Sequence, residues 1–341
     1  MPPSTVARAQ VSEQDKAYFA GYTDADGCIS LATFVRNAAR YWYAYIFFGQ
    51  TQPETVERLQ AVYGGSLRVE KRDLRRRRQK QLRLQRLNDV RRFLSDIRPH
   101  LREKYAQAEI ILERFDPRAD LDTNQALSAR LAQLKATRLG TFTIEPRLAI
   151  EVQTHRKCFD CTARAFSRGF CAKHYQKAKR EGRLVTNPKG TGIPFVSRRS
   201  LKEFDAPYFA GYFDGDGCVL LRRQGTRWYP CIAFSQTQPQ TLMELHSIYG
   251  GSLAIVRARD ERSRPKLNYQ LVQREAVFAM LQDMIPFLIE KRVQVELILQ
   301  KYRAGMSLHE GQSLKEQLSD MKRRTFDEPL TKRRTNNCGE S

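Results

Sequence analysis

The sequence predicts an α+β fold in which two copies of one αββαββα domain, each with an antiparallel sheet, pack about a pseudo-twofold axis. Three observations predict it. A segment of about 120 residues occurs twice, each copy alternates helical and strand patterns, and further copies are absent. A period this long, present twice, favours duplication of a whole domain over a solenoid of short repeats.

Each copy begins with a segment of small and aromatic residues that ends in two carboxylates. Tyr18–Cys28 reads YFAGYTDADGC, and Tyr208–Cys218 reads YFAGYFDGDGC. Alanine and glycine at its centre would let one helix approach another backbone closely, and the glycine after the second aspartate would end the helix. We therefore expect two helices that pack through residues 20–21 and 210–211.

Strands and a further helix follow in each copy. Tyr41–Phe48 is rich in aromatic residues, and Leu82 and Leu84 alternate with polar neighbours, so both segments are predicted strands. A proline suits a first helical turn and a Gly-Gly pair ends a helix, which predicts helices over residues 53–62 and 239–247.

The composition indicates a folded protein that binds a polyanion. Lys and Arg number 59 against 37 Asp and Glu, the formal charge is +22, and 41% of the residues are hydrophobic. Charge alone leaves DNA, RNA and an anionic membrane open. No apolar run approaches the roughly eighteen residues that span a bilayer, and residues 1–15 lack a secretory signal. We expect an intracellular, DNA-associated protein with no membrane partner.

Polar side chains share faces of the predicted strands, because alternate residues of a strand point the same way. Such faces can bind the edges of bases. The candidate contacts of the first copy are Arg68, Arg72, Gln81, Arg83 and Gln85, and those of the second copy are Arg222, Arg257, Asn268 and Gln270. Since Arg83 corresponds to Gln270, the two half-sites should differ in sequence.

Length and composition divide the chain into four parts. Residues 1–140 are expected to form the first domain and residues 201–330 the second. Residues 141–200 form a linker with a small module at about 155–183, and residues 331–341 form a disordered tail.

The linker contains the pattern Cys158-x2-Cys161-x9-Cys171-x2-His174, whose spacing suits a tetrahedral structural zinc ion. It resembles the short Cys3His knuckles attached to some phage and organelle nucleases. We expect this basic module to extend the DNA footprint; the alternative is a reduced, metal-free connector. An odd total of seven cysteines favours a reducing compartment.

The two carboxylates at the end of each predicted N-terminal helix face the negative end of its dipole. If the two helices pack together, these acids converge, and their repulsion favours a bound Mg²⁺ or Mn²⁺. The alternative is that the aspartates only form polar turns beside glycine.

Both motifs, Phe19–Gly27 and Phe209–Gly217, resemble the signature of the LAGLIDADG homing endonuclease family, and the resemblance covers both repeats. It implies that the second acid of each motif binds the catalytic metal with the help of a neighbouring backbone carbonyl, whereas the first acid shapes the helix end. The implied metal ligands are Asp26 and Ala25 in the first copy and Asp216 and Gly215 in the second.

The same resemblance places Gln52 and Gln238 at the periphery of the active site, and Lys104 and Lys291 near the scissile phosphate. A lysine there would offset charge that develops in the transition state, and a glutamine would position a water molecule. The alternative for either lysine is a solvated charge on a helix face.

The resemblance implies a site-specific homing endonuclease that acts as a monomer on double-stranded DNA. It would make metal-dependent staggered double-strand breaks in a long asymmetric target. The alternative is a protein of the same fold that does not cut, either an RNA maturase that binds intron RNA or a DNA-binding regulator. Retention of both Asp26 and Asp216 favours cleavage.

Overall fold

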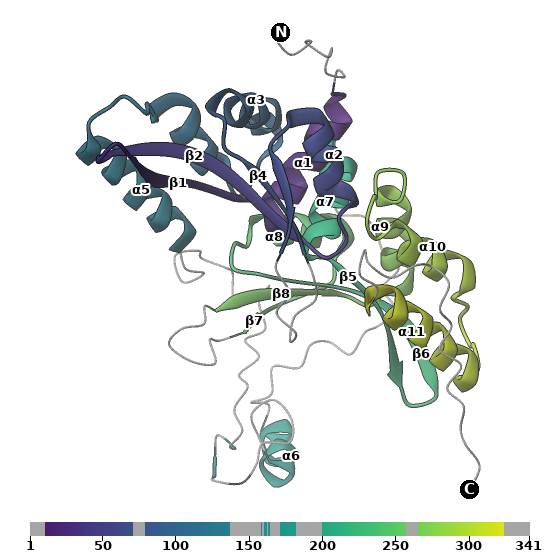
Figure 1. Cartoon of the computed structure of the whole chain (residues 1–341). Coiled ribbons are helices and arrows are strands. Elements are labelled where there is room, and N and C mark those ends of the chain that lie inside the picture. Colours follow the sequence, from purple (N-terminus) through teal and green to yellow (C-terminus); the bar gives the residue numbers. More distant parts are fainter. Residues whose placement is uncertain are drawn as a thin grey trace, which may run out of the picture.

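A computed structural model describes residues 11–70, 79–136, 158, 160–161, 163, 171–181, 200–256 and 265–323 (Figure 1). It contains two halves, each built on a four-stranded antiparallel sheet, with strand orders β1-β2-β4-β3 and β5-β6-β8-β7. The predicted α+β fold with two antiparallel sheets is therefore confirmed. Arg72 and Arg257, the arginine-rich stretch between β3 and β4, and the tail lie outside the described residues.

The first half follows the predicted αββαββα order and then continues in helices. Its elements are α1 (Glu13–Asp26), β1 (Cys28–Arg36), β2 (Ala39–Gln50), α2 (Glu54–Tyr63), β3 (Ser66–Val69), β4 (Lys80–Leu84), α3 (Leu87–Ile97), η1 (Arg98–His100), α4 (Tyr105–Glu109), η2 (Ile110–Arg114) and α5 (Leu121–Ala136).

The second half repeats this order. Its elements are α7 (Asp205–Asp216), β5 (Cys218–Gln224), β6 (Arg227–Gln236), α8 (Gln240–Tyr249), β7 (Ser252–Val256), β8 (Lys266–Leu271), α9 (Arg274–Met284), α10 (Arg292–Lys301) and α11 (Leu308–Arg323). Along the chain, α6 (Ala172–Arg180) comes between the two halves. Within the part of the chain that the structure describes, no helix is both long and apolar enough to cross a bilayer.

Each sheet has one buried and one open face. In the first sheet the alternate residues Ile46, Phe48, Leu82 and Leu84 are completely buried, and α3 contacts this face. The residues between them belong to the opposite face, as the alternation of apolar and polar residues predicted. Strands of both sheets therefore have a second face whose residues are more polar and more exposed than those of the core face.

The helices that follow the two prolines begin and end close to where the sequence predicted. They cover Glu54–Tyr63 and Gln240–Tyr249, directly after Pro53 and Pro239. The glycine after α2, Gly64, has φ 82°, a left-handed conformation that favours glycine and stops the helix. Proline and glycine therefore set both ends of these helices.

The two halves meet through α1 and α7, which lie side by side at the centre of the molecule (Figure 1). A Cβ atom at Gly21 would lie 1.9 Å from the carbonyl oxygen of Tyr208, and one at Gly211 would lie 1.9 Å from that of Tyr18. Only glycine permits this approach, so the predicted contact through the small residues is confirmed. It brings the C-terminal ends of the two helices together.

Candidate functional site

The second aspartates of the two motifs, Asp26 and Asp216, are the last residues of α1 and α7 and meet at the pseudo-twofold axis. A Cβ atom at Gly215 would lie only 2.4 Å from the Cβ atom of Ala25 and 3.2 Å from Oδ2 of Asp26. The residues that were expected to hold a metal therefore lie together, two from each half.

Both carboxylates are difficult to ionise. Burial and, after it, the negative charge of Asp26 together raise the pKa of Asp216 to about 6, although Lys104 and Lys291 act in the opposite direction. Burial also raises the pKa of Asp26, against the same two lysines. The two lysines do not fully compensate these two partly buried acids, and a bound cation would relieve the remaining repulsion.

Lys104 and Lys291 bind the ends of the two helices. The Lys104 ammonium donates to the carbonyl oxygens of Thr23 at 2.7 Å and Asp24 at 2.6 Å. In the second half, Lys291 donates to three carbonyl oxygens, at 2.7 Å on Phe213, 2.6 Å on Asp214 and 3.1 Å on Gly215. The lysines thus offset the negative ends of the helix dipoles beside the aspartates. Neither is a freely solvated charge.

Asp24, the first acid of its motif, is 2% exposed and holds the loop that carries Lys104. Its carboxylate accepts the backbone N–H groups of Arg102, Glu103 and Lys104 at 2.8, 3.1 and 2.8 Å. It also accepts the hydroxyl of Tyr208, from the other half, at 2.7 Å. Asp24 therefore positions the lysine and joins the two halves.

Asp214 plays the same part in the second half. It accepts the backbone N–H groups of residues 289–291 at 2.8, 3.2 and 2.8 Å, and the hydroxyl of Tyr18 at 2.7 Å. These contacts agree with the expectation that the first acid of each motif shapes the end of its helix.

A pair of glutamates next to the two lysines, Glu103 partly buried and Glu290 buried, was not singled out from the sequence. Tyr212 donates its hydroxyl to Glu103 at 3.0 Å, and Tyr22 donates to Glu290 at 3.0 Å, so each bond crosses between the halves. Burial, followed by the charge of Asp24, raises the pKa of Glu103 to about 8. The repeated Glu-Lys pair was the available signal in the sequence.

The glutamines that reach the carboxylates are not the two that the resemblance assigned. Gln50 donates its side-chain amide to Oδ2 of Asp26, and Gln236 donates to Oδ2 of Asp216. Both are the last residues of long strands, whereas Gln52 and Gln238 lie two positions beyond. The roles of Gln52 and Gln238 stay predictions, and the geometry adds Gln50 and Gln236 to the site.

A second pair of lysines contacts the first residues of the strands that follow α1 and α7. Lys135, near the end of α5, donates to the hydroxyl of Ser30 and lies 3.5 Å from Sγ of Cys28. Lys322 of α11 lies 3.0 Å from Sγ of Cys218 and donates to the carbonyl oxygen of Val219 at 2.6 Å. The sequence repeat extends to this pair, because Leu134-Lys135 corresponds to Met321-Lys322.

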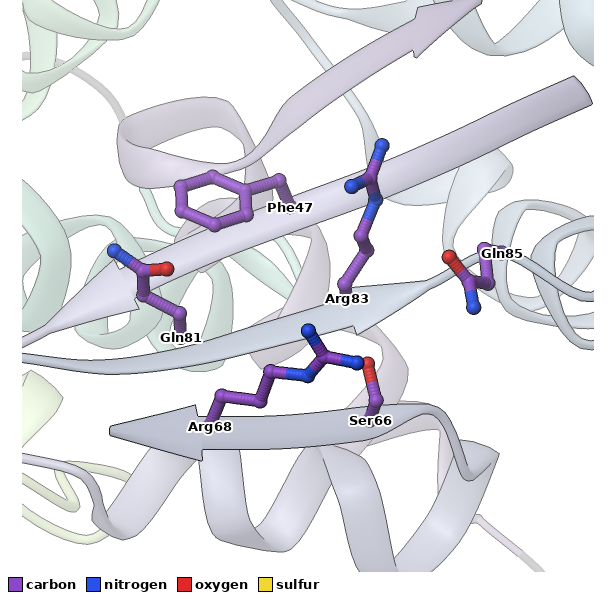
Figure 2. A pocket seen from close by; sticks show the side chains of 6 residues that line it. All are labelled: Phe47, Ser66, Arg68, Gln81, Arg83 and Gln85. Carbon is purple, nitrogen blue, oxygen red and sulfur yellow. The ribbon is translucent and has the colours of Figure 1, made fainter. Parts of the chain in front are cut away.

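The open face of the first sheet is hollowed by a polar pocket. Figure 2 shows the side chains that line it, which are Phe47, Ser66, Arg68, Gln81, Arg83 and Gln85. Four of these six were predicted DNA contacts and they do share one face. On the second sheet Arg222 donates to Oε1 of Gln270 at 3.2 Å, and Asn268 lies two residues away on the same strand face.

The four expected zinc ligands lie within 4.8 Å of one another. Cys161 Sγ lies 3.8 Å from Cys171 Sγ, and His174 Nδ1 lies 3.4 Å from the sulfur atoms of both Cys158 and Cys171. In a tetrahedral zinc site two sulfur atoms are about 3.8 Å apart, and sulfur and nitrogen about 3.5 Å. The cluster therefore fits zinc in its donor types and its spacing.

Comparisons with known proteins agree with this architecture. Residues 203–279 match the family model described as LAGLIDADG-like domain. LAGLIDADG meganuclease I-AabMI, solved bound to uncleaved DNA, is similar in fold at a TM-score of 0.50 and 13% identity, over 88% of this chain and 98% of that chain. Meganuclease I-SmaMI, bound to uncleavable DNA, matches at a TM-score of 0.49 and 16% identity, over 91% and 100%. A search of curated protein sequences found no match.

The family match covers the second motif and its sheet, and the structural likeness covers both halves. The resemblance to LAGLIDADG proteins that the two motifs suggested is confirmed, as is the fold.

Proposed function

We propose that this protein is a DNA endonuclease that cuts both strands of a long, asymmetric duplex target with staggered ends. The observation that carries the proposal is the paired site at the pseudo-twofold axis. Each half contributes one partly buried aspartate at a helix end, one glutamine bonded to that aspartate, and one lysine bonded to the same helix end.

The carboxylates of Asp26 and Asp216 are suited to hold a divalent cation, Mg²⁺ or Mn²⁺. They are partly buried, adjacent and of like charge, and hard cations prefer oxygen ligands. The carbonyl oxygens of Ala25 and Gly215 lie at the same helix ends and would complete the ligand set. Such an ion would supply positive charge to the attacked phosphate.

The other side chains arrange the site. Gln50 and Gln236 fix the orientation of the two carboxylates through their amide groups. Lys104 and Lys291 hold ammonium groups at the helix ends, where they would offset charge that develops on a bound phosphate. A charged group that is already held in place needs little reorganisation during the reaction.

Two equivalent centres explain why both strands would be cut. The strands of a duplex are related by twofold axes, so a protein with a pseudo-twofold axis can present one centre to each strand. The two open polar sheet faces and the formal charge of +22 favour a duplex as the ligand. I-AabMI and I-SmaMI, the similar meganucleases, were solved with DNA, which supports the same partner here.

The test is to incubate the full chain with a library of duplexes and Mg²⁺ and to sequence the ends. We expect cuts at one long site, nicking of one strand after either Asp26→Asn or Asp216→Asn, and no cutting by the double variant. Asp122→Asn, at an exposed position of α5, is the matched control and should cut normally.

Cutting that persists in the double variant would overturn the assignment of the site. Specific binding without any cut by the unaltered protein would instead support a maturase or regulator of the same fold.

A further inference from the structure

The pocket on the first sheet contains two arginines on neighbouring strands. Arg68 on β3 pairs with Gln81, two residues before Arg83 on β4, so the two guanidinium groups flank one opening (Figure 2). Ordinary sheet surfaces separate like charges, because like charges on neighbouring strands repel. This concentration of positive charge suits an electron-rich ligand.

Arg83 is held in place by two tyrosines of β2. Its Nη2 donates to the hydroxyl of Tyr43 at 2.8 Å, and its guanidinium carbon lies 4.3 Å from the ring centroid of Tyr45. Its Nε is buried and has no hydrogen-bond partner among the described residues. Stacking and hydrogen bonding restrict the plane of the guanidinium, so little side-chain entropy would be lost on binding.

The corresponding place on the second sheet has the same backbone and different chemistry. In the first sheet, Arg83 pairs with Phe47, and Gln81 pairs with Arg68. In the second sheet, the equivalent pairs are Gln270 with Ala233 and Asn268 with Ala254. The two charges of the first pocket are therefore missing at the equivalent positions. The replacements, in order from the first sheet to the second, are Phe47 to Ala233, Arg68 to Ala254, Arg83 to Gln270 and Gln85 to Val272.

On the second sheet, an arginine from a different strand lies next to Gln270. Arg222 comes from β5, at the position of Ala32 in the first half, and donates to Oε1 of Gln270 at 3.2 Å. This contact occupies the acceptor of Gln270. The lone pair of Gln270 Oε1 that accepts from Arg222 is therefore not available to a base donor. The second face thus differs from the first in both charge and hydrogen-bond pattern.

We propose that the first-sheet pocket is a guanine-reading site, with Arg83 as the specificity-determining residue and Arg68 beside it, and that the target carries guanine there in one half-site only. This inference rests on the proposed DNA substrate. In the major groove guanine presents two acceptors, O6 and N7, that match the two parallel donors of an arginine. A guanidinium with a fixed plane selects this pattern, whereas a mobile one would bind any phosphate.

The experiment selects bound duplexes from a randomised library, using full-length protein with Asp26→Asn and Asp216→Asn so that the DNA stays uncut. With the pocket intact, we expect guanine at one or two adjacent positions of one half-site. Arg83→Gln should reduce that preference by about 5- to 150-fold and leave the other half-site unchanged. Arg40→Gln, on the opposite face of the same sheet, is the matched control.

Two further variants separate base recognition from phosphate binding. Arg83→Lys keeps the charge and loses the fixed planar pair of donors, so the guanine preference should fall, but by less than in Arg83→Gln because an ammonium can also donate to O6 and N7. The reciprocal change Gln270→Arg should add a guanine preference at the symmetry-related position. Equal weakening of all sequences by Arg83→Gln, together with full rescue by Arg83→Lys, would identify a phosphate contact and overturn the inference. Absence of any duplex binding by the starting protein would overturn the proposed function as well.

Discussion

Replacing Gly21 by alanine tests whether the close contact of α1 and α7 holds the two halves together. The added methyl carbon would lie 1.9 Å from the backbone oxygen of Tyr208, where ordinary contacts begin at 3.4 Å. The helices would have to move apart by about 1.5 Å, since a backbone oxygen cannot rotate away as a side chain can. Overpacking of this kind costs about 3 kcal/mol, which corresponds to a fall in the unfolding midpoint of about 4 °C for a chain of 341 residues.

Thermal unfolding followed by circular dichroism measures the effect. Gly49→Ala is the control, because a methyl group there meets side chains alone, the tip of Gln79 at 3.3 Å and the ring of Phe47 at 3.5 Å. Gly211→Ala should cost as much as Gly21→Ala, since it meets Tyr18 in the same way. One separation of the helices relieves both clashes, so the double variant should lose less than the sum. A loss below 0.5 kcal/mol, or strict additivity, would refute the reasoning.

Two further predictions concern groups outside the metal-binding carboxylates. Because burial raises the pKa of Glu103 from 4.5 to about 8, the folded protein keeps a proton that the unfolded chain releases, and the free energy of unfolding should fall as pH rises through this range. Glu103→Gln should reduce that fall in urea unfolding at pH 6 and pH 9; an unchanged slope would contradict it. Protein purified without chelator should contain one zinc ion, and Cys171→Ser should lose it. The same substitution should shorten DNase protection at one end of the target. A metal-free protein would refute the zinc site, and an unchanged footprint would refute its role in DNA binding.

Local sequence signals predicted the parts of the fold that depend on local chemistry. Pro53 and Gly64 mark the ends of α2, and the Ala-Gly pair in the α1 motif predicted the helix contact. The strand faces followed from alternation alone, so the grouping of Gln81 with Arg83 was also predictable.

The choice of glutamine depended on something that the sequence does not show directly. Gln50 and Gln52 are both repeated in the second half, and either could be brought to Asp26. Strand β2 ends at Gln50, which leaves that side chain level with the end of α1, and the chain then turns away into α2. The length of a paired strand is set by its neighbours in the sheet, so local pattern was insufficient.

The two halves are alike at the axis and different elsewhere, and the differences have a structural logic. Arg102 bonds to Asp205 at 2.6 Å and lies 3.9 Å from the ring centroid of Tyr208, whereas its counterpart, Ile289, is apolar. A homodimer would have to repeat this contact on both sides, but one continuous chain can keep it on a single side. The same freedom allows Arg83 on one sheet and Gln270 on the other. Duplication within a chain therefore preserves paired chemistry at the axis while each sheet acquires its own recognition surface.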